Sequence, residues 1–163
     1  MSAKSPVKTI TRAAVIAALY VVLTYLTNLF GLASGVIQVR FSEALCILPM
    51  FTVSAIPGLT LGCILANLLT GAVTADVIFG SLATLLGALG SYALRRIKWL
   101  APLPPVLSNA FIVPLVLRYA YGVPDAYWFM VATVGAGELI SICGIGMPVC
   151  YPIFRKFSKQ LFS

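Results

Sequence analysis

Arg40 and Glu43 interrupt an otherwise apolar stretch, IQVRFSEALCILPMF, over residues 37–51. The two residues are three positions apart, so a helix would place them on one face, where a guanidinium and a carboxylate can pair. Two roles fit this pattern: an ion pair at the start of a helix, or the rim of a pocket that binds a polar ligand. Their role therefore depends on which other polar residues share their end of the molecule.

Glu138 stands among small residues in the segment GAGELISICGIG. It lies 12 residues into a helix predicted over residues 126–154, which is about 18 Å at a rise of 1.5 Å per residue. In a membrane span this depth is near the bilayer centre, where an ionised side chain costs roughly 2.5–3.5 kcal/mol and is usually paired or faces a wet cavity. The pattern fits either a carboxyl group held within helix packing or a carboxylate that faces a ligand.

Asp76, Asn67 and Asn109 are further candidates for ligand contact. Asp76 opens a predicted helix whose inward face carries small residues, so it either caps that helix or faces a ligand. The amides of Asn67 and Asn109 offer both donors and acceptors, as recognition of a heterocycle requires, although amides also join helices to one another. Pro114 is expected to kink the helix that carries Asn109, and a kink beside a polar residue points to a cavity.

Trp128 belongs to an aromatic group near one predicted helix end, together with Tyr119, Tyr121 and Tyr127. Such groups commonly form a belt at the membrane interface. Trp128 could instead stack on a flat ligand, and the sequence leaves both roles open.

The composition identifies the elements that must position these residues. The chain has 163 residues, 61% of them hydrophobic and only 9% charged, with a mean hydropathy of +1.04. Soluble domains carry about 25% charged residues, so we expect an all-α integral membrane protein with one domain over residues 1–163. The sequence has no histidine, no P-loop and no HExxH motif, and its four cysteines lack metal-binding spacing. It therefore predicts a binding protein with no cofactor or metal, and not an enzyme.

Six apolar segments are predicted to form a bundle of six transmembrane helices. The second and third segments are shorter than the roughly 20 residues of a full crossing, so they could form a broken or re-entrant pair. The first segment is longer than the core of a signal peptide, and we interpret it as a retained helix. The six predicted helices span residues 10–30, 42–52, 57–71, 76–94, 104–121 and 126–154.

The basic residues predict the orientation of this bundle. If both termini are cytoplasmic, nine of the eleven Lys and Arg residues lie inside, and only Arg40 and Arg118 lie toward the outside. This asymmetry follows the positive-inside rule and removes any need for a nucleic-acid partner. The same topology places all four acidic residues, Glu43, Asp76, Asp125 and Glu138, in the outer half or near the middle of the membrane.

Five segments taken together resemble the QueT family: VRFSEAL, IPGLTLGCILANLLTG, DVIFGSLATLLGAL, LPPVLSNAFIV and GAGELI. The resemblance covers nearly the whole chain, from about residue 10 to residue 152. Members of this family are substrate-binding S components of energy-coupling factor transporters, linked to uptake of queuosine precursors. The resemblance implies a six-helix bundle in the bacterial cytoplasmic membrane with a substrate pocket near the outer face.

The resemblance also implies partners and a ligand. The partners are a transmembrane coupling protein and two cytoplasmic ATPases, which fits the absent P-loop. S components typically meet the coupling protein through small residues on the first helix, and the corresponding residues here are Ala13, Ala14, Ala17 and Ala18, although internal packing would use the same spacing. The implied ligand is a 7-deazaguanine base: queuine, its aminomethyl precursor or its cyano precursor.

Within such a pocket, we expect Arg40 and Glu43 at the mouth, and Glu138 and Asn67 deeper toward the ligand. Asp76, Asn109 and Trp128 complete the predicted ligand contacts. Two alternatives stay open from the sequence: an S component for another vitamin-like solute, and a membrane protein with no transport role.

Overall fold

The computed structural model describes residues 6–32 and 37–162, and every regular element among them is helical. The all-helical prediction is confirmed, and the predicted helix ends mostly lie within a few residues of the observed ones. The elements are α1 (Pro6–Leu29), η1 (Phe41–Met50), α2 (Ala55–Leu69), α3 (Thr74–Ala93), α4 (Leu103–Tyr119), α5 (Tyr127–Glu138), η2 (Leu139–Cys150) and α6 (Tyr151–Phe162).

Three of the helical segments are long and apolar enough to cross a membrane: Pro6–Leu29, Thr74–Ala93 and Tyr127–Lys156. Three more, η1, α2 and α4, are apolar but shorter. The prediction of six crossings with cytoplasmic termini therefore stays a prediction.

The short second element, η1, is a 3₁₀-helix of ten residues that contains Pro49. A 3₁₀-helix rises about 2.0 Å per residue and an α-helix 1.5 Å, so ten residues reach about 20 Å instead of 15 Å. Proline lacks the N–H that a regular helix would use. Every residue from Ser42 to Pro49 is buried, so η1 forms the centre of the bundle.

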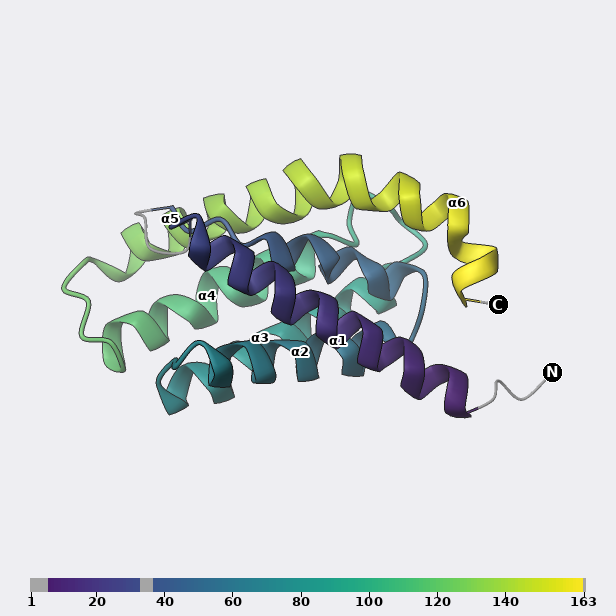
Figure 1. The fold of residues 1–163 in the computed structure, drawn as a ribbon. Coiled ribbons are helices and arrows are strands. Elements are labelled where there is room, and N and C mark those ends of the chain that lie inside the picture. Colours follow the sequence, from purple (N-terminus) through teal and green to yellow (C-terminus); the bar gives the residue numbers. More distant parts are fainter. Residues whose placement is uncertain (1–5, 33–36, 163) are drawn as a thin grey trace.

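The last three elements run on as one long helical rod along one side of the bundle (Figure 1). Its middle section, η2, is π-helical and contains Pro148. The start of α1 and the end of α6 lie at the same end of the bundle, and the last residues of α1, α2 and α4 lie at the opposite end (Figure 1).

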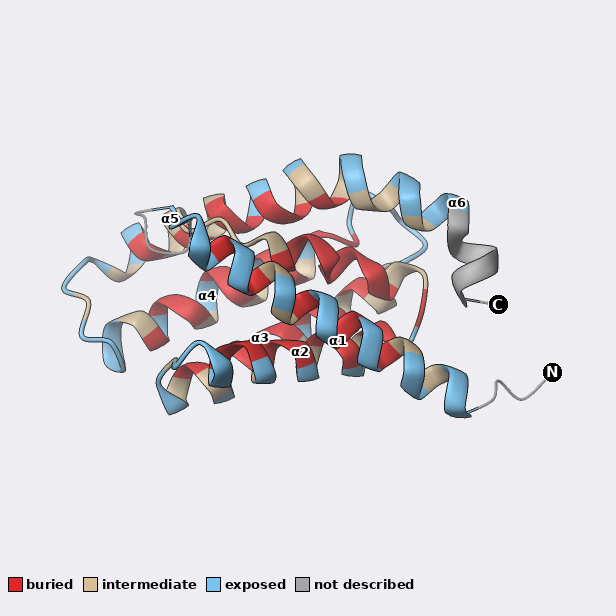
Figure 2. Ribbon diagram, in the orientation of Figure 1, coloured by how far each residue is buried: buried red, intermediate tan, exposed pale blue. Residues whose placement is uncertain are grey.

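Burial follows the pattern of a protein that faces lipid. Buried residues line the inner faces of the helices, and exposed ones cover the outer faces (Figure 2). Many of the exposed residues are large and apolar, such as Leu61, Phe79 and Leu86, which are 50%, 48% and 49% exposed. Water would not favour such an outer surface, but hydrocarbon does.

The first two α-helices approach each other closely through small residues. A Cβ atom at Gly62 of α2 would lie 2.7 Å from the Cβ of Tyr20 and 3.1 Å from the Cα of Ala17. Only glycine fits this distance, so Ala17 and Gly62 set how closely α1 packs against α2.

Candidate functional site

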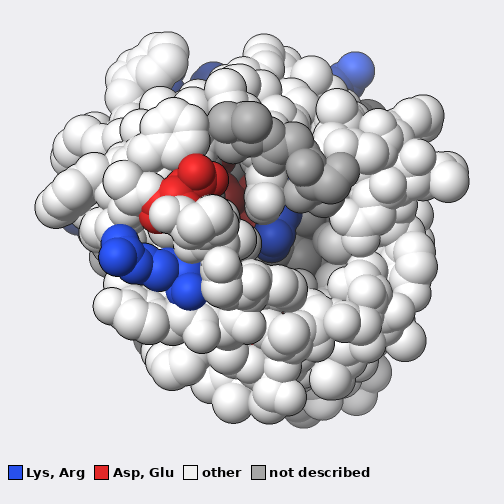
Figure 3. Space-filling view, turned by 90° about the vertical axis from the view of Figure 1, so that its left-hand side faces the viewer, with Lys and Arg blue, Asp and Glu red and all other residues white. Residues whose placement is uncertain are grey.

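A polar cavity of about 400 Å³ opens at the end of the bundle opposite the termini. Figure 3 looks onto this end: acidic side chains gather at one edge of a hollow, and basic atoms lie within it, while most of the surrounding surface is uncharged. We call this cavity the outer pocket. Its polar lining residues are Thr24, Thr27 and Asn28 of α1, Gln38 and Arg40 before η1, Asn67 and Thr70 of α2 and its end, Asp76 of α3, and Tyr121 after α4.

One wall of the outer pocket is built where α2 ends and α3 begins. The side-chain amide of Asn67 donates to the backbone carbonyl of Asp76 at 3.2 Å and more weakly to Cys63 Sγ at 3.7 Å. The Tyr121 hydroxyl donates to Asp76 Oδ2 at 3.1 Å. Partial burial, and then the nearby Asp76 carboxylate, raise the pKa of Tyr121 above its ordinary value, so this phenol keeps the proton that it donates.

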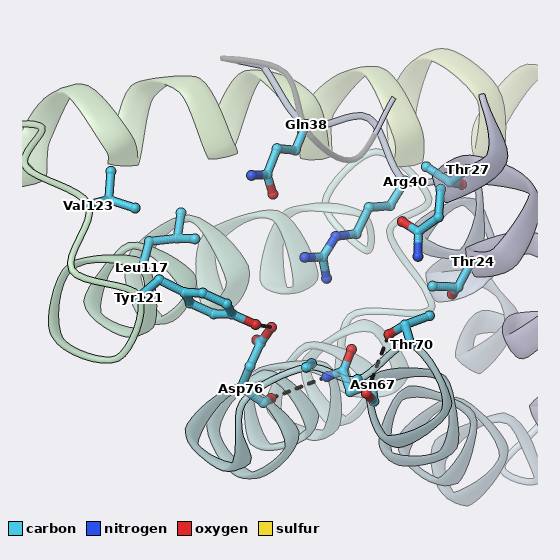
Figure 4. A pocket seen from close by; sticks show the side chains of 13 residues that line it. Thr24, Thr27, Gln38, Arg40, Asn67, Thr70, Asp76, Leu117, Tyr121 and Val123 are labelled. Carbon is cyan, nitrogen blue, oxygen red and sulfur yellow. Dashed lines mark hydrogen bonds between the residues drawn. The ribbon is translucent and has the colours of Figure 1, made fainter. Parts of the chain in front are cut away.

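Arg40 extends into the outer pocket from the opposite side (Figure 4). Its backbone is held in place, because its N–H donates to Ser141 Oγ at 3.1 Å and the next N–H, of Phe41, donates to Thr27 Oγ1 at 3.0 Å. Among the described residues, no ion pair joins Arg40 to Glu43. The pairing considered from their spacing is therefore absent, because the two side chains leave the chain in different directions.

Glu43 points into the bundle and collects three donors from three different elements. The hydroxyl of Tyr20 donates to its Oε1, and Cys46 Sγ and Asn109 Nδ2 approach its Oε2 at 3.0 and 3.3 Å. Glu43 is 2% exposed, so it lies inside the bundle and not at the mouth of the pocket, where we expected it. The four residues Tyr20, Glu43, Cys46 and Asn109, together with Glu138, are called the Glu43 cluster below.

Glu138 is the member of this cluster whose hydrogen-bonding capacity is not fully used. It is 6% exposed, and within the described part of the chain its Oε2 atom has no hydrogen-bond partner. Glu43, Asn109 and Arg40 interact with it, the first of them as a like charge. Arg40 also interacts electrostatically with Asp76 and Glu43, so its charge acts on acidic groups of both the outer pocket and the cluster.

The structure thus divides the predicted ligand contacts into three places. Arg40, Asn67 and Asp76 line the outer pocket. Glu43, Asn109 and Glu138 form the buried cluster. Trp128 is 71% exposed and contacts the ring of Tyr127.

The four alanines of the first helix lie on two different faces of it, one buried and one exposed. Ala13 and Ala17 are 8% and 5% exposed and lie close to Gly58 and Gly62 of α2. Ala14 and Ala18 are exposed. Two of the four alanines expected at a partner interface are thus used in internal packing.

Sequence reasoning missed several residues of both regions. Tyr20 is fully enclosed, yet in the sequence it resembles any aromatic residue of an apolar helix. The spacing of Thr24, Thr27 and Asn28 was an available signal, since positions three and four apart share a helix face. Tyr121 was only grouped with the aromatic residues near one predicted helix end, for which a belt at the membrane interface and ligand stacking both stayed open. None of the described residues form a group of three or more His, Cys, Asp or Glu side chains suited to a metal ion.

Comparison with known proteins adds an independent finding. A family model described as "QueT transporter" matches residues 10–155. The curated protein named "Queuosine precursor transporter QueT" from Lactococcus lactis subsp. cremoris (strain MG1363) is 40% identical over 82 residues, which is 50% of this chain and 48% of that protein. The match thus spans about half the length of the curated relative. No solved structure matches the chain.

Proposed function

Because this chain belongs to the QueT transporter family, we propose that it is the substrate-binding membrane subunit of an energy-coupling factor importer for a queuosine precursor. It is a multi-pass protein of the cell membrane. The observation that carries the proposal is the outer pocket, a cavity of about 400 Å³ in an otherwise apolar bundle, which lies within the usual size range of ligand sites.

The proposed ligand is a 7-deazaguanine base bound among Arg40, Asn67 and Asp76. Such a base presents adjacent N–H donors and a carbonyl acceptor, and the pocket offers both acceptors and donors. We place Glu43, Asn109 and Glu138 behind the ligand, as a layer that holds the bundle together and balances the charge of Arg40. Trp128 then acts at the membrane interface, where an exposed tryptophan is commonly found.

Calorimetry on the detergent-purified protein tests this assignment with queuine, 7-aminomethyl-7-deazaguanine and 7-cyano-7-deazaguanine, against thiamine and riboflavin as unrelated solutes. We expect saturable binding of at least one deazaguanine and none of the vitamins. Asp76→Asn should weaken binding about ten- to a hundredfold, the loss of one charge-assisted hydrogen bond. Asp125→Asn is the matched control, because Asp125 is exposed and does not line the pocket. Binding of a vitamin alone would replace the proposed ligand with another solute.

We further propose that ATP hydrolysis occurs in partner subunits, and that a coupling protein docks on α1 through Ala14 and Ala18. The support is that these two alanines are exposed, whereas Ala13 and Ala17 pack against α2. Small residues on an outer helix face allow another helix to approach closely.

A pair of substitutions separates docking from packing. Ala14→Trp should abolish uptake in cells and co-purification of ATPase subunits, yet leave ligand binding to the isolated protein unchanged. Ala17→Trp should in addition lower the free energy of unfolding by about 1–3 kcal/mol or more, because tryptophan is too large for the buried contact between α1 and α2. Normal uptake by Ala14→Trp, or purification without any ATPase partner, would exclude this docking surface.

A further inference from the structure

The outer pocket separates its free donors from its free acceptors. Arg40 lies on one side, held by the backbone hydrogen bonds of Arg40 and Phe41 to Ser141 and Thr27. Asn67 and Asp76 lie on the other side (Figure 4). This arrangement restricts which chemical groups a ligand can present to each wall.

The guanidinium of Arg40 can only donate hydrogen bonds. Among the described residues it has no side-chain hydrogen bond and no ion pair, although Asp76, Glu43 and Glu138 attract it from a distance. Its five N–H groups are therefore available in the pocket, and a ligand that meets them must carry an acceptor.

The facing wall offers acceptors. Asn67 donates to the backbone carbonyl of Asp76 with its side-chain NH₂ group, because a carbonyl oxygen only accepts. The side-chain Oδ1 atom of Asn67 therefore points the other way. Figure 4 shows this oxygen on the side that faces Arg40. Asp76 uses Oδ2 for the Tyr121 hydroxyl, and in the described part of the chain no donor reaches its Oδ1.

A ligand that satisfies both walls carries an acceptor at one position and N–H donors beside it. The lactam edge of a guanine-like base has this pattern: a carbonyl at C6, then the ring N1–H and the exocyclic amine. Arginine usually reads guanine through both O6 and N7, but a 7-deaza base has no N7, so the carbonyl alone is left for the guanidinium.

We propose that Arg40 is the specificity-determining residue of the outer pocket and selects 6-oxo over 6-amino heterocycles by donating to the C6 carbonyl, while Asn67 and Asp76 accept from the adjacent N–H groups. This inference rests on the proposed function and adds which edge of the ligand each wall binds. A 6-amino analogue would turn an N–H donor toward a guanidinium that cannot accept. Sites built around such hydrogen bonds reject the wrong partner strongly, since buried polar groups are left unpaired.

The test compares 7-deazaguanine with 2,6-diamino-7-deazapurine, which keeps the exocyclic 2-amine but replaces the carbonyl by an amine and turns the ring N1–H donor into an N1 acceptor. Isothermal calorimetry on the purified full chain should give at least a hundredfold preference for the 6-oxo base, on the order of the loss of one or two charge-assisted hydrogen bonds. Arg40→Gln should weaken binding of the 6-oxo base about ten- to a hundredfold and reduce the preference by about tenfold, because an amide can both donate and accept. The part of the preference that comes from N1 at the wall of Asn67 and Asp76 should remain.

Two further variants make the result specific. Arg40→Lys keeps the charge and a donor, so it should retain part of the preference. Arg118→Gln removes an exposed arginine that does not line the pocket, and it should leave both affinities unchanged. The melting temperature of each variant checks that it is folded.

The outcomes separate this inference from the proposed function. If deazaguanines bind, but the wild-type protein shows no preference or Arg40→Gln lowers both affinities equally, Arg40 does not read the carbonyl and only this inference falls. If no deazaguanine binds the wild-type protein, the proposed ligand itself is wrong and this inference falls with it.

Discussion

The outer pocket and the surroundings of Glu43 contain the same kinds of residues, yet the carboxylates of Asp76 and Glu43 are in opposite states. Both regions have a tyrosine hydroxyl that donates to a carboxylate, Tyr121 to Asp76 and Tyr20 to Glu43. The Glu43 carboxylate has three donors, whereas Asp76 uses Oδ2 for Tyr121 and no donor within the described part of the chain reaches its Oδ1. A satisfied network stabilises the fold, and an unsatisfied one is free to bind. The comparison therefore predicts that removing Glu43 or one of its donors lowers stability, whereas substitutions in the pocket lower affinity.

The largest effect is expected for Glu43→Ala. It would leave the buried Tyr20 hydroxyl, Cys46 thiol and Asn109 amide without their common acceptor, and each bond to a charged group is worth about 1.5–3 kcal/mol. We expect the free energy of unfolding in detergent to fall by at least about 3 kcal/mol. Asp76→Ala is the control and should cost less than half as much, because it removes a single side-chain hydrogen bond. Equal losses in the two variants would remove the distinction between the regions.

The two tyrosines give a matched pair with smaller changes. Tyr20→Phe removes one donor from a fully buried carboxylate, so it should lower the free energy of unfolding by about 1.5–3 kcal/mol. Tyr121 is 44% exposed, and Tyr121→Phe should change stability by less than about 0.5 kcal/mol. Tyr121→Phe should instead weaken ligand binding by less than tenfold, because the Tyr121 hydroxyl only orients Asp76. Chemical unfolding and calorimetry on the same preparations measure both quantities, and a reversed order would contradict the assignment.

The two asparagines sharpen the comparison further. Asn67→Leu should weaken ligand binding about tenfold, because it removes a hydrogen-bond acceptor from the pocket. The leucine side chain has nearly the same shape as the asparagine that it replaces. Asn109→Leu should change affinity by less than about threefold and lower stability by about 1–3 kcal/mol, because Glu43 loses a buried donor. If Asn109→Leu weakened binding as much as Asn67→Leu, the ligand would have to extend into the cluster.

The smallest effect is expected for Glu138→Gln. The substitution keeps the shape of the side chain and removes a charge that lies near the like charge of Glu43, so stability should stay equal or rise. Ligand affinity should change by less than about threefold, because Glu138 is buried and does not line the outer pocket. A loss above tenfold would mean that Glu138 meets the ligand directly, as its depth in the membrane first suggested.

The sequence was most informative about helices and least informative about their rotation. The apolar runs that begin near Ile10, Asp76 and Pro104 predicted α1, α3 and α4 to within a few residues, because burial in lipid requires continuous apolar segments. The rotation of η1 about its own axis could not be predicted, and it decides that Glu43 faces the cluster. The extended backbone before η1 directs Arg40 to the pocket. In a 3₁₀-helix residues three apart lie on one face, but Arg40 precedes the helix in extended backbone.

The sequence by itself determined the class of this protein: an apolar, helical membrane protein with few charges and most of its basic residues near the predicted cytoplasmic ends. Hydrophobicity and charge along the chain are enough for this, because the membrane imposes them locally. Only the tertiary structure decided which polar residues are free to bind. Arg40, Asn67, Asp76 and Tyr121 come from four separate segments of the chain, and whether a donor has a partner depends on neighbours that are distant in sequence.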